Sequence, residues 1–306
     1  MEPLGLTPIE KQFITEKIRV SPNCYKVKGK IRRKHEVAIV LPTYCEAGNI
    51  RKLIEEIESL NIDPLILVVD DSSPDETAKI VEEMQKKFSN ILLIVRPAKR
   101  GLGTAITDAF RFLLSLRQKP KYIITMDADF SHNPRDIPRL LSLAKMGYDL
   151  VVGSRYCPGG KTEKWSPIRV LISKIANIFA STILNTKVSD CTSGFRCYSI
   201  RLLKDVIRRL HSQTYEIQIE TIRQAVKNGF YIAEIPIIFT NRKLGRSKLT
   251  LNEIRQFLSY IIKANLEEYF AFPIYNLALL RLKNRNLFTP METYLTLLLE
   301  QNKKLI

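Results

Sequence analysis

Residues 122–134 read YIITMDADFSHNP. An apolar run ends there at two aspartates, Asp127 and Asp129, which a histidine and a proline follow closely. The apolar run predicts a buried strand, and the aspartates mark the place where that strand ends. Ligands of open parallel sheets bind just beyond the carboxyl ends of the strands. This stretch therefore predicts both a sheet and a polar site at one edge of it.

Similar apolar runs occur on both sides of this stretch, and segments of helical periodicity separate them. The predicted strands are VAIVL (37–41), LILVV (65–69), ILLIV (91–95), YIITM (122–126) and DLVVG (149–153). The segments NIRKLIEEIESL (49–60) and ETAKIVEEMQKKF (76–88) are examples of the intervening helices. Parallel strands need such crossover helices. The pattern predicts an α/β fold with a Rossmann-like, doubly wound, mostly parallel sheet.

The chain divides into three expected regions. Residues 1–36 form a basic N-terminal extension, residues 37–250 the α/β domain, and residues 251–306 an amphipathic helical C-terminal region. The second half of the domain contains longer helical segments at 168–184 and 215–229, followed by a strand-like run at 230–240.

Composition and charge restrict the function. The 306 residues are 45% hydrophobic, which is typical of a globular fold. They carry a net charge of +17, which favours anionic partners. Five cysteines without CxxC spacing and only three histidines argue against a zinc cluster and for a reduced, cytoplasmic protein. We expect no membrane-spanning segment, no secretory signal and no nucleic-acid partner, because no long apolar run, leader or nucleic-acid motif occurs.

Paired acids follow two of the predicted strands, as VVDDSSPD (68–75) and as DAD (127–129). Neighbouring carboxylates resist joint ionisation unless a cation is present, and oxygen ligands suit Mg²⁺ or Mn²⁺. The alternative is that these acids cap helices, because Asp129 to Asn133 precede a predicted helix near Asp136.

Basic residues that could meet a phosphate occur in two places. The loop NRKLGRSK (241–248) contains Arg242 and Lys248, and the segment after the strand at 149–153 contains Arg155, with Arg169 and Ser173 one helical turn apart beyond it. Each could equally be a solvated surface charge. The glycines of RGLGTA (100–105) lack the full dinucleotide or P-loop pattern, so tight packing of loop against helix is the better interpretation.

Seven motifs in one order resemble a known family. They are PTYCE (42–46), DDSSPD (70–75), GLGTA (101–105), DADFSHNP (127–134), GSRY (153–156), DCTSGFR (190–196) and R-x-x-G-x-S-K (242–248). Together they resemble the polyprenyl-phosphate sugar synthases of the dolichol-phosphate mannosyltransferase type, among the inverting GT-A glycosyltransferases of family 2. The resemblance covers about residues 37–262.

The resemblance implies transfer of mannose from GDP-mannose to a dolichyl or polyprenyl phosphate, on the cytoplasmic face of a membrane that the protein contacts peripherally. It assigns roles by position. Donor-binding residues would be Pro42, Tyr44, Glu46, Val69, Asp71, Asp127, Ala128, Asp129, Arg242 and Lys248; the metal would lie on Asp127 and Asp129; acceptor-binding residues would be Arg155, Arg169 and Ser173. Asp127, Asp129 and Arg242 would carry the catalysis.

Departures from the pattern are few. Cys45 stands where the family usually has asparagine, and Ser72 stands where glycine is common. Because the acceptor oxygen is a phosphate that is already anionic, in-line displacement with inversion needs no strong general base, and none is evident. Two alternatives remain open: a UDP-glucose-dependent polyprenyl-phosphate glucosyltransferase, and a phosphohydrolase of the haloacid dehalogenase type with Asp127 as nucleophile. Ser131 breaks the second pattern.

Overall fold

The computed structural model describes residues 14–19, 24–241 and 260. The chain forms two compact units, Met1–Gln256 and Phe257–Ile306, and all that follows concerns the first. The expected basic loop at 242–248 and the expected C-terminal helices at 251–306 lie outside the described residues.

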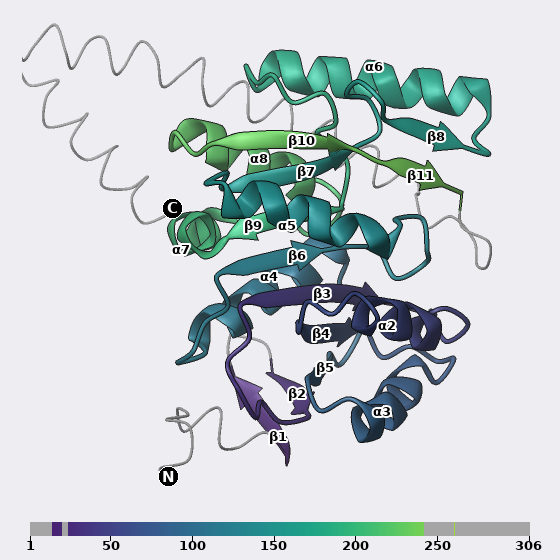
Figure 1. Ribbon diagram of the computed structural model, residues 1–306, viewed down its shortest axis with the longest axis vertical. Coiled ribbons are helices and arrows are strands. Elements are labelled where there is room, and N and C mark those ends of the chain that lie inside the picture. The colour runs from purple at the N-terminus through teal and green to yellow at the C-terminus, as the bar shows by residue number, and fades with distance from the viewer. Residues whose placement is uncertain (1–13, 20–23, 242–259, 261–306) are drawn as a thin grey trace, which may run out of the picture. The chain divides into compact units, whose positions relative to one another are not determined.

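A nine-stranded sheet runs through the described part of the first unit (Figure 1). Its strands in spatial order are β1 (Ile14–Arg19), β2 (Cys24–Lys28), β5 (Ile91–Val95), β4 (Leu65–Asp70), β3 (Val37–Thr43), β6 (Tyr122–Thr125), β9 (Arg196–Ser199), β7 (Leu150–Ser154) and β10 (Ile232–Pro236). The pairs β5–β4, β4–β3, β3–β6 and β7–β10 are parallel. The predicted mostly parallel α/β fold is confirmed.

Helices cover both faces of this sheet. They are α2 (Ile50–Glu58), α3 (Thr77–Lys87), α4 (Leu102–Ser115), α5 (Ile137–Lys145), α6 (Pro167–Ile183), α7 (Ile200–Val206) and α8 (Ile217–Lys227), with 3₁₀ turns at Pro134–Asp136 and Ile207–Arg209. The apolar stripes of α2, α3 and α5 pack into one core with strand residues. Helices α4, α7 and α8 pack together on the other face (Figure 1).

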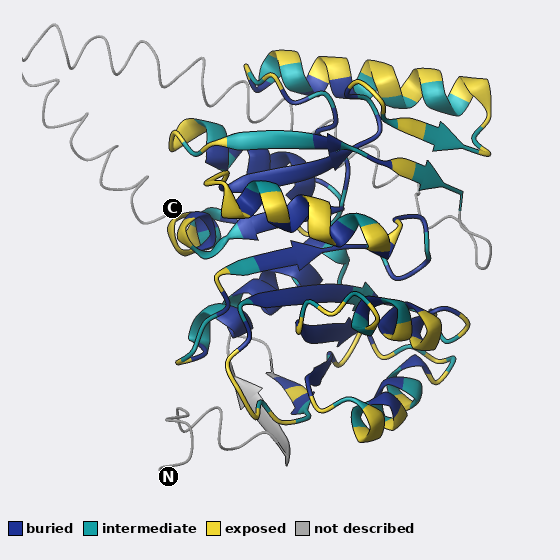
Figure 2. Ribbon diagram, viewed as in Figure 1, coloured by how far each residue is buried: buried dark blue, intermediate teal, exposed yellow. Residues whose placement is uncertain are grey.

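Helix α6 is the exception. Of its 17 residues only Asn177 and Ala180 are buried, so it runs along the molecule with most of its surface in solvent (Figure 2). It lies beside a small two-stranded parallel sheet formed by β8 (Lys161–Glu163) and β11 (Ile238–Thr240).

Two features of the sheet were not anticipated. Strand β9 runs antiparallel between β6 and β7, and β2 joins β5 antiparallel, which extends the sheet with part of the segment before residue 37. The side chains of Tyr25 and Val27 on β2 are buried in the core. The basic N-terminal extension thus contributes strands to the domain that the sequence interpretation began at Val37.

The parallel strands place their carboxyl ends at one edge of the sheet. Residues that follow β3, β4, β6 and β7, together with those that precede β9, meet at this edge. It is the edge at which the sequence predicted the polar site.

Candidate active site

Asp127 and Asp129 follow β6 at the centre of this edge. The Asp127 side chain is 38% exposed, whereas Asp129 is buried and its Oδ1 accepts a hydrogen bond from the Ser131 amide at 3.0 Å. Phe130, directly after Asp129, has a φ of +60°, a left-handed conformation that turns the loop sharply. The pair therefore lies in a tight loop in which one carboxylate reaches solvent.

His132 is hydrogen-bonded to the backbone of this loop. It is fully buried, and its Nδ1 accepts a hydrogen bond from the Asp127 amide at 3.2 Å. Burial lowers the pKa of His132 from its ordinary value, and the opposing fields of Asp127 and Asp129 do not overcome that effect. The ring is therefore neutral at pH 7, which agrees with Nδ1 acting as an acceptor.

The donor set at Asp127 and Asp129 fits a hard divalent cation. The described residues contain no group of three or more histidine, cysteine or acidic side chains that could hold a metal. Mg²⁺ and similar ions are commonly held by one or two carboxylates, with water and substrate phosphates completing the shell. The helical turn that follows the aspartates is capped by Asn133 and not by Asp129. The Asn133 side chain accepts a hydrogen bond from the Arg135 amide at 3.0 Å.

Two strands away, the acids after β4 are bonded to the protein. Asp70 is fully buried and accepts hydrogen bonds from Thr43 Oγ1 at 2.9 Å and from the Ser73 amide at 2.9 Å. The two carboxylate oxygens of Asp71 accept hydrogen bonds from Nε and Nη2 of Arg96, at 2.5 and 2.8 Å. Arg96 is itself fully buried and also contacts Asp108 at 3.2 Å. Asp71 is thus held in a fixed orientation by a buried bidentate ion pair.

The loop after β3 is bound to the loop after β4. The Glu46 amide donates to Thr77 Oγ1 at 3.0 Å, and the Ala47 amide donates to Asp75 Oδ2 at 3.0 Å. Burial opposes ionisation of Asp75, but its hydrogen bonds to Thr77 and Ala47 outweigh that effect and lower its pKa. Cys45, with a φ of +59°, is exposed at the tip, and its amide donates to Ser73 Oγ at 3.0 Å.

The glycines of RGLGTA pack against a neighbouring loop, as the sequence interpretation expected. Gly101 has a φ of +93°, and a Cβ at Gly103 would lie 2.5 Å from the Ser212 carbonyl oxygen. Helix α4 can therefore begin there only with glycine at these positions.

On the other side of the aspartates, Arg155 follows β7 and is buried against Asp190. Its Nε and Nη2 donate to the two Asp190 oxygens, each at 2.7 Å, and Nη2 also donates to Thr192 Oγ1 at 2.6 Å. Burial opposes ionisation of Asp190, but the charge of Arg155 and its hydrogen bonds lower the pKa of Asp190 below its ordinary value. The two side chains form a fixed, charge-compensated pair.

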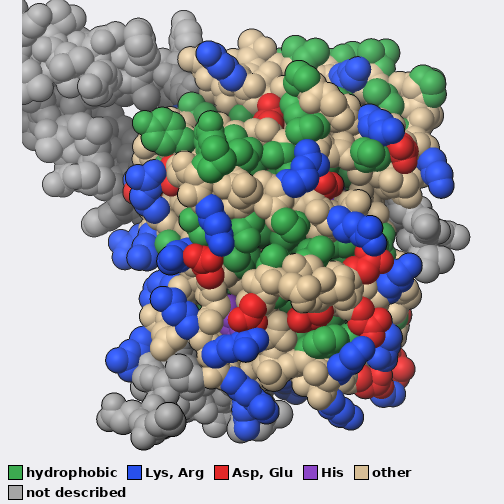
Figure 3. Space-filling model, viewed as in Figure 1, with side chains coloured by type: hydrophobic (Ala, Val, Ile, Leu, Met, Phe, Trp, Pro, Cys, Tyr) green, Lys and Arg blue, Asp and Glu red, His purple; other side chains and the backbone are tan. Residues whose placement is uncertain are grey.

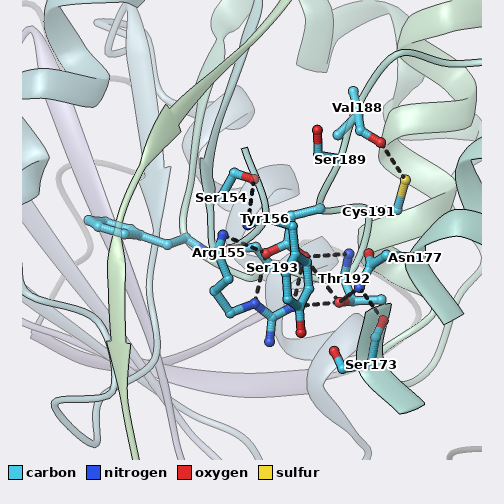
Figure 4. Close-up of polar contacts among 12 residues, drawn as sticks. Ser154, Arg155, Tyr156, Ser173, Asn177, Val188, Ser189, Cys191, Thr192 and Ser193 are labelled. Carbon is cyan, nitrogen blue, oxygen red and sulfur yellow. Dashed lines mark hydrogen bonds and ion pairs between the residues drawn. The ribbon is translucent and has the colours of Figure 1, made fainter. Parts of the chain in front are cut away.

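Helix α6 is joined to this pair. Asn177 Nδ2 donates to Thr192 Oγ1 at 3.1 Å and to the Ser173 carbonyl at 2.8 Å, and Figure 4 shows Ser173 and Asn177 on the same helix beside Arg155. The Arg169 guanidinium lies 3.8 Å from the centre of the Trp165 ring, and that of Arg155 lies 5.5 Å from it. Two of the three predicted acceptor residues, Arg155 and Arg169, therefore lie against one tryptophan ring.

Aromatic rings join this cluster to the aspartate loop. His132 lies 5.1 Å from Phe239, and Phe239 lies 5.5 Å from Trp165, measured between ring centres. Trp165 Nε1 and Tyr156 Oη are buried without a hydrogen-bond partner among the described residues. The cluster formed by Arg155 and Arg169 around Trp165 thus contains two polar groups that have no protein partner in the described part of the chain.

The predicted residues fall into groups by position. Pro42, Tyr44, Glu46, Val69 and Asp71 lie on and after β3 and β4, and Ala128 lies between the two aspartates. Arg155 and Arg169 lie against Trp165, and Ser173 lies on α6 one turn beyond Arg169. Arg242 and Lys248 lie outside the described residues, and the individual roles stay predictions. Sequence reasoning assigned no role to Arg96, His132, Trp165 or Asp190. His132 and Asp190 lie within the motifs DADFSHNP and DCTSGFR, which were the signals that could have been used.

Comparison with known proteins places the chain. The family model "Glycosyl transferase family 2" matches residues 38–207, more than half of the chain. A polyprenol monophosphomannose synthase from Mycolicibacterium smegmatis is 35% identical over 228 residues, which cover 74% of this chain and 85% of that protein. An undecaprenyl-phosphate mannosyltransferase from Micrococcus luteus is 32% identical over 215 residues, 70% of this chain and 87% of that protein. The resemblance drawn from the seven motifs is confirmed.

Solved structures agree on the fold. Glucosyl-3-phosphoglycerate synthase from Mycobacterium tuberculosis, crystallised with Mn²⁺, UDP and glucosyl-3-phosphoglycerate, superposes with a TM-score of 0.55 at 18% identity. The match covers 76% of this chain and 79% of that one. The GT-A architecture expected from the motifs is thereby confirmed.

Proposed function

We propose that this chain, which belongs to glycosyl transferase family 2, transfers mannose from GDP-mannose to the phosphate of a dolichol or other polyprenol. The enzyme class follows from the family match, and the substrates are inferred from relatives that are named as polyprenyl-phosphate mannose transferases. One observation carries the proposal: a row of three contacting aromatic rings, His132, Phe239 and Trp165, connects the DAD loop (127–129) to the arginine cluster around Trp165. The proposed cation site would thus lie next to the proposed site for the acceptor phosphate.

The residues of the site fit an in-line displacement. Asp127 and Asp129 would hold Mg²⁺ or Mn²⁺, which offsets negative charge on the leaving diphosphate. The lipid phosphate would be received by Arg169, by the Arg155–Asp190 pair and by the two unbonded donors of Trp165 and Tyr156. Because the attacking oxygen is anionic before it reacts, no side chain has to remove a proton from it. A direct displacement by that oxygen inverts the anomeric centre.

The isoprenoid chain of the proposed acceptor lies in a bilayer, so the protein needs a surface that contacts the bilayer. Helix α6 offers such a surface. Six large apolar side chains on α6 are exposed: Ile168, Leu171, Ile172, Ile175, Ile178 and Phe179. Their spacing of three and four residues puts them on one stripe, and the helix contains no acidic residue. In the space-filling view hydrophobic side chains gather over α6 with lysine and arginine between them (Figure 3).

Such a helix is suited to lie in the headgroup layer of an anionic membrane. Among the described residues no helix is long and apolar enough to span a bilayer. The proposed location is accordingly peripheral, on the cytoplasmic face of a membrane, with α6 as the contact and Arg169 at its lipid-facing start.

The test is a transfer assay with a panel of donors. The protein is incubated with GDP-[³H]mannose or UDP-[³H]glucose, Mn²⁺ and polyprenyl phosphate in vesicles, and the label is then extracted into organic solvent. Extraction of mannose label supports the proposal. Extraction of glucose label alone would instead support the UDP-glucose alternative, and label that stays aqueous with both donors would refute lipid glycosylation.

The variant Asp129→Asn is the matched negative control for this assay. It keeps the size of a buried side chain while removing its charge, so transfer should fall at least about 100-fold while the melting temperature changes little. Full activity in this variant would remove the cation assignment. The phosphohydrolase alternative is contradicted by the family match and is not pursued.

A further inference from the structure

Gln218 near the start of α8 is a buried amide whose side chain has no bonding role in the fold. It is 2% exposed, and neither its Oε1 nor its Nε2 has a hydrogen-bond partner among the described residues. A buried amide without partners destabilises a protein, so such a group calls for an explanation in terms of an absent ligand or water.

The backbone that carries Gln218 is, in contrast, held firmly. The buried guanidinium of Arg196 donates from Nη1 to the Gln218 carbonyl at 2.5 Å and to Thr221 Oγ1 at 2.8 Å. Its Nε donates to the Ser193 carbonyl at 2.7 Å, which joins α8 to the segment before β9. The neighbouring acid Glu216 accepts hydrogen bonds from the loop before α8. The backbone that carries the unbonded amide is therefore held in place by Arg196, whose guanidinium is itself hydrogen-bonded on several sides.

The Gln218 amide and Asp127 both lie beside Gly194, which has no side chain to come between them. A Cβ at Gly194 would lie 3.4 Å from Gln218 Nε2 and 3.6 Å from Asp127 Oδ1. Both distances are ordinary contact distances, so an alanine would fit there, but it would occupy the volume that both polar atoms border. The Gly194 carbonyl is held by Thr125 Oγ1 at 2.8 Å, which keeps this backbone beside the DAD loop.

The order of the strands indicates what enters that space. Along the carboxyl edge the order is β4, β3, β6, β9, β7. The expected nucleotide residues follow β4 and β3, the two aspartates follow β6, and Arg155 of the acceptor cluster follows β7. In a sugar transfer the anomeric carbon lies between the donor diphosphate and the attacking phosphate. The sugar ring should thus lie between β6 and β7, next to the segment that leads into β9, where Gly194 and Gln218 are found.

From this arrangement we infer that Gln218 recognises the donor sugar by hydrogen-bonding one of its hydroxyl groups, and that Gly194 leaves the room for that sugar. The inference rests on the proposed function and deepens it. A hydroxyl both donates and accepts, so it can pair with either end of the amide, and the orientation of the amide does not affect the argument. Gln218 is then a specificity-determining residue on the wall of the sugar pocket opposite the cation site.

The test compares binding of a nucleotide with binding of the corresponding nucleotide sugar. GDP and GDP-mannose are titrated calorimetrically, with Mn²⁺, into the full-length wild type and into Gln218→Leu. Leucine removes both polar atoms at similar volume, so the variant should bind GDP-mannose about tenfold or more weakly and bind GDP within about twofold of the wild type. Its melting temperature should be equal or higher, because an unbonded buried amide has been removed.

Two further variants make the result specific. Gly194→Ala should show the same selective loss, because its methyl group fills the sugar space without a clash. Gln224→Leu makes the same chemical change further along α8 and should bind both ligands like the wild type. The inference is overturned if Gln218→Leu binds GDP-mannose as the wild type does, or if it loses GDP and GDP-mannose equally.

Failure of the proposed function looks different, because it is seen in the wild type. If the wild type binds UDP-glucose and not GDP-mannose, the proposed donor is wrong, and the same comparison is made with UDP and UDP-glucose. If the wild type binds no nucleotide sugar, both the function and the inference fall.

Discussion

Removing two isoleucines from the exposed stripe of α6 should detach the protein from membranes without harming its fold. Ile172 and Ile178 are 62% and 65% exposed. Complete burial of an isoleucine side chain is worth about 1.5–3 kcal/mol, so the exposed part of each is worth about 1 kcal/mol or more when it enters a bilayer. The double variant Ile172→Ser/Ile178→Ser should therefore lose at least about 2 kcal/mol of binding free energy, a roughly 30-fold drop in the partition coefficient.

The measurement is co-sedimentation with vesicles that contain anionic lipid, at several lipid concentrations. The matched control is Met146→Ser/Tyr231→Ser, because these side chains are 73% and 68% exposed but lie near the amino end of β7, at the opposite edge of the sheet. The control should sediment like the wild type, and both variants should melt within a few degrees of it, because surface substitutions change stability little.

Equal sedimentation of the α6 variant and the wild type would refute the membrane role of this stripe. Equal loss in both double variants would show that binding follows total surface hydrophobicity and not the α6 surface. Transfer to a short, water-soluble polyprenyl phosphate adds a second check, because the α6 variant should retain it while losing transfer to lipid in vesicles.

Three other properties are predicted by the structure. Arg96→Met should lower the free energy of unfolding in urea by about 3–5 kcal/mol, because it leaves buried carboxylates without their partner. Arg33→Met, at an ion pair with Asp63 in which both side chains are exposed, should have a far smaller effect, and equal effects would contradict this account. A maleimide at pH 7 should label exposed Cys45 and not Cys191, because burial raises the pKa of Cys191 to about 12, and GDP should slow the labelling of Cys45 if that loop binds the nucleotide. The pKa of Asp190 is lower in the folded protein than in the unfolded chain. The ionised Asp190 therefore stabilises the fold above the unfolded pKa of about 3.9, and this stabilisation is lost as the pH falls below that value. The stability of Asp190→Asn should accordingly fall less steeply with decreasing pH below about pH 4.

The central strands and the place of the site could be predicted because both depend on local patterns. Uninterrupted apolar runs such as LILVV at 65–69 became strands buried on both faces, and the acids at their ends came to lie at the carboxyl edge. Strand β9 was missed because Arg196 and Cys197 form no apolar run, and the strand exists only because β6 and β7 provide partners on both sides. Its pairing is a tertiary effect that no local pattern contains.

The partners of the charged groups could not be predicted either. The sequence interpretation treated Arg155 as a phosphate ligand and Asp71 as a nucleotide ligand, and the structure shows both already in buried ion pairs with Asp190 and Arg96. These pairs join residues 35 and 25 positions apart in sequence. Which acid meets which arginine depends on how the loops fold over the sheet edge, and sequence spacing does not determine that.

These pairings limit the chemistry that the edge can perform. Asp75 accepts a hydrogen bond that holds two loops together, and Asp190 is compensated by Arg155. A carboxylate with several such donors keeps a low pKa and is a poor proton acceptor at pH 7. An acceptor hydroxyl would need a base to become a nucleophile, whereas a phosphate monoester needs only to be held and oriented. A glycosyltransferase whose acids at this edge are occupied in this way is suited to an acceptor that is already anionic, such as a phosphate monoester.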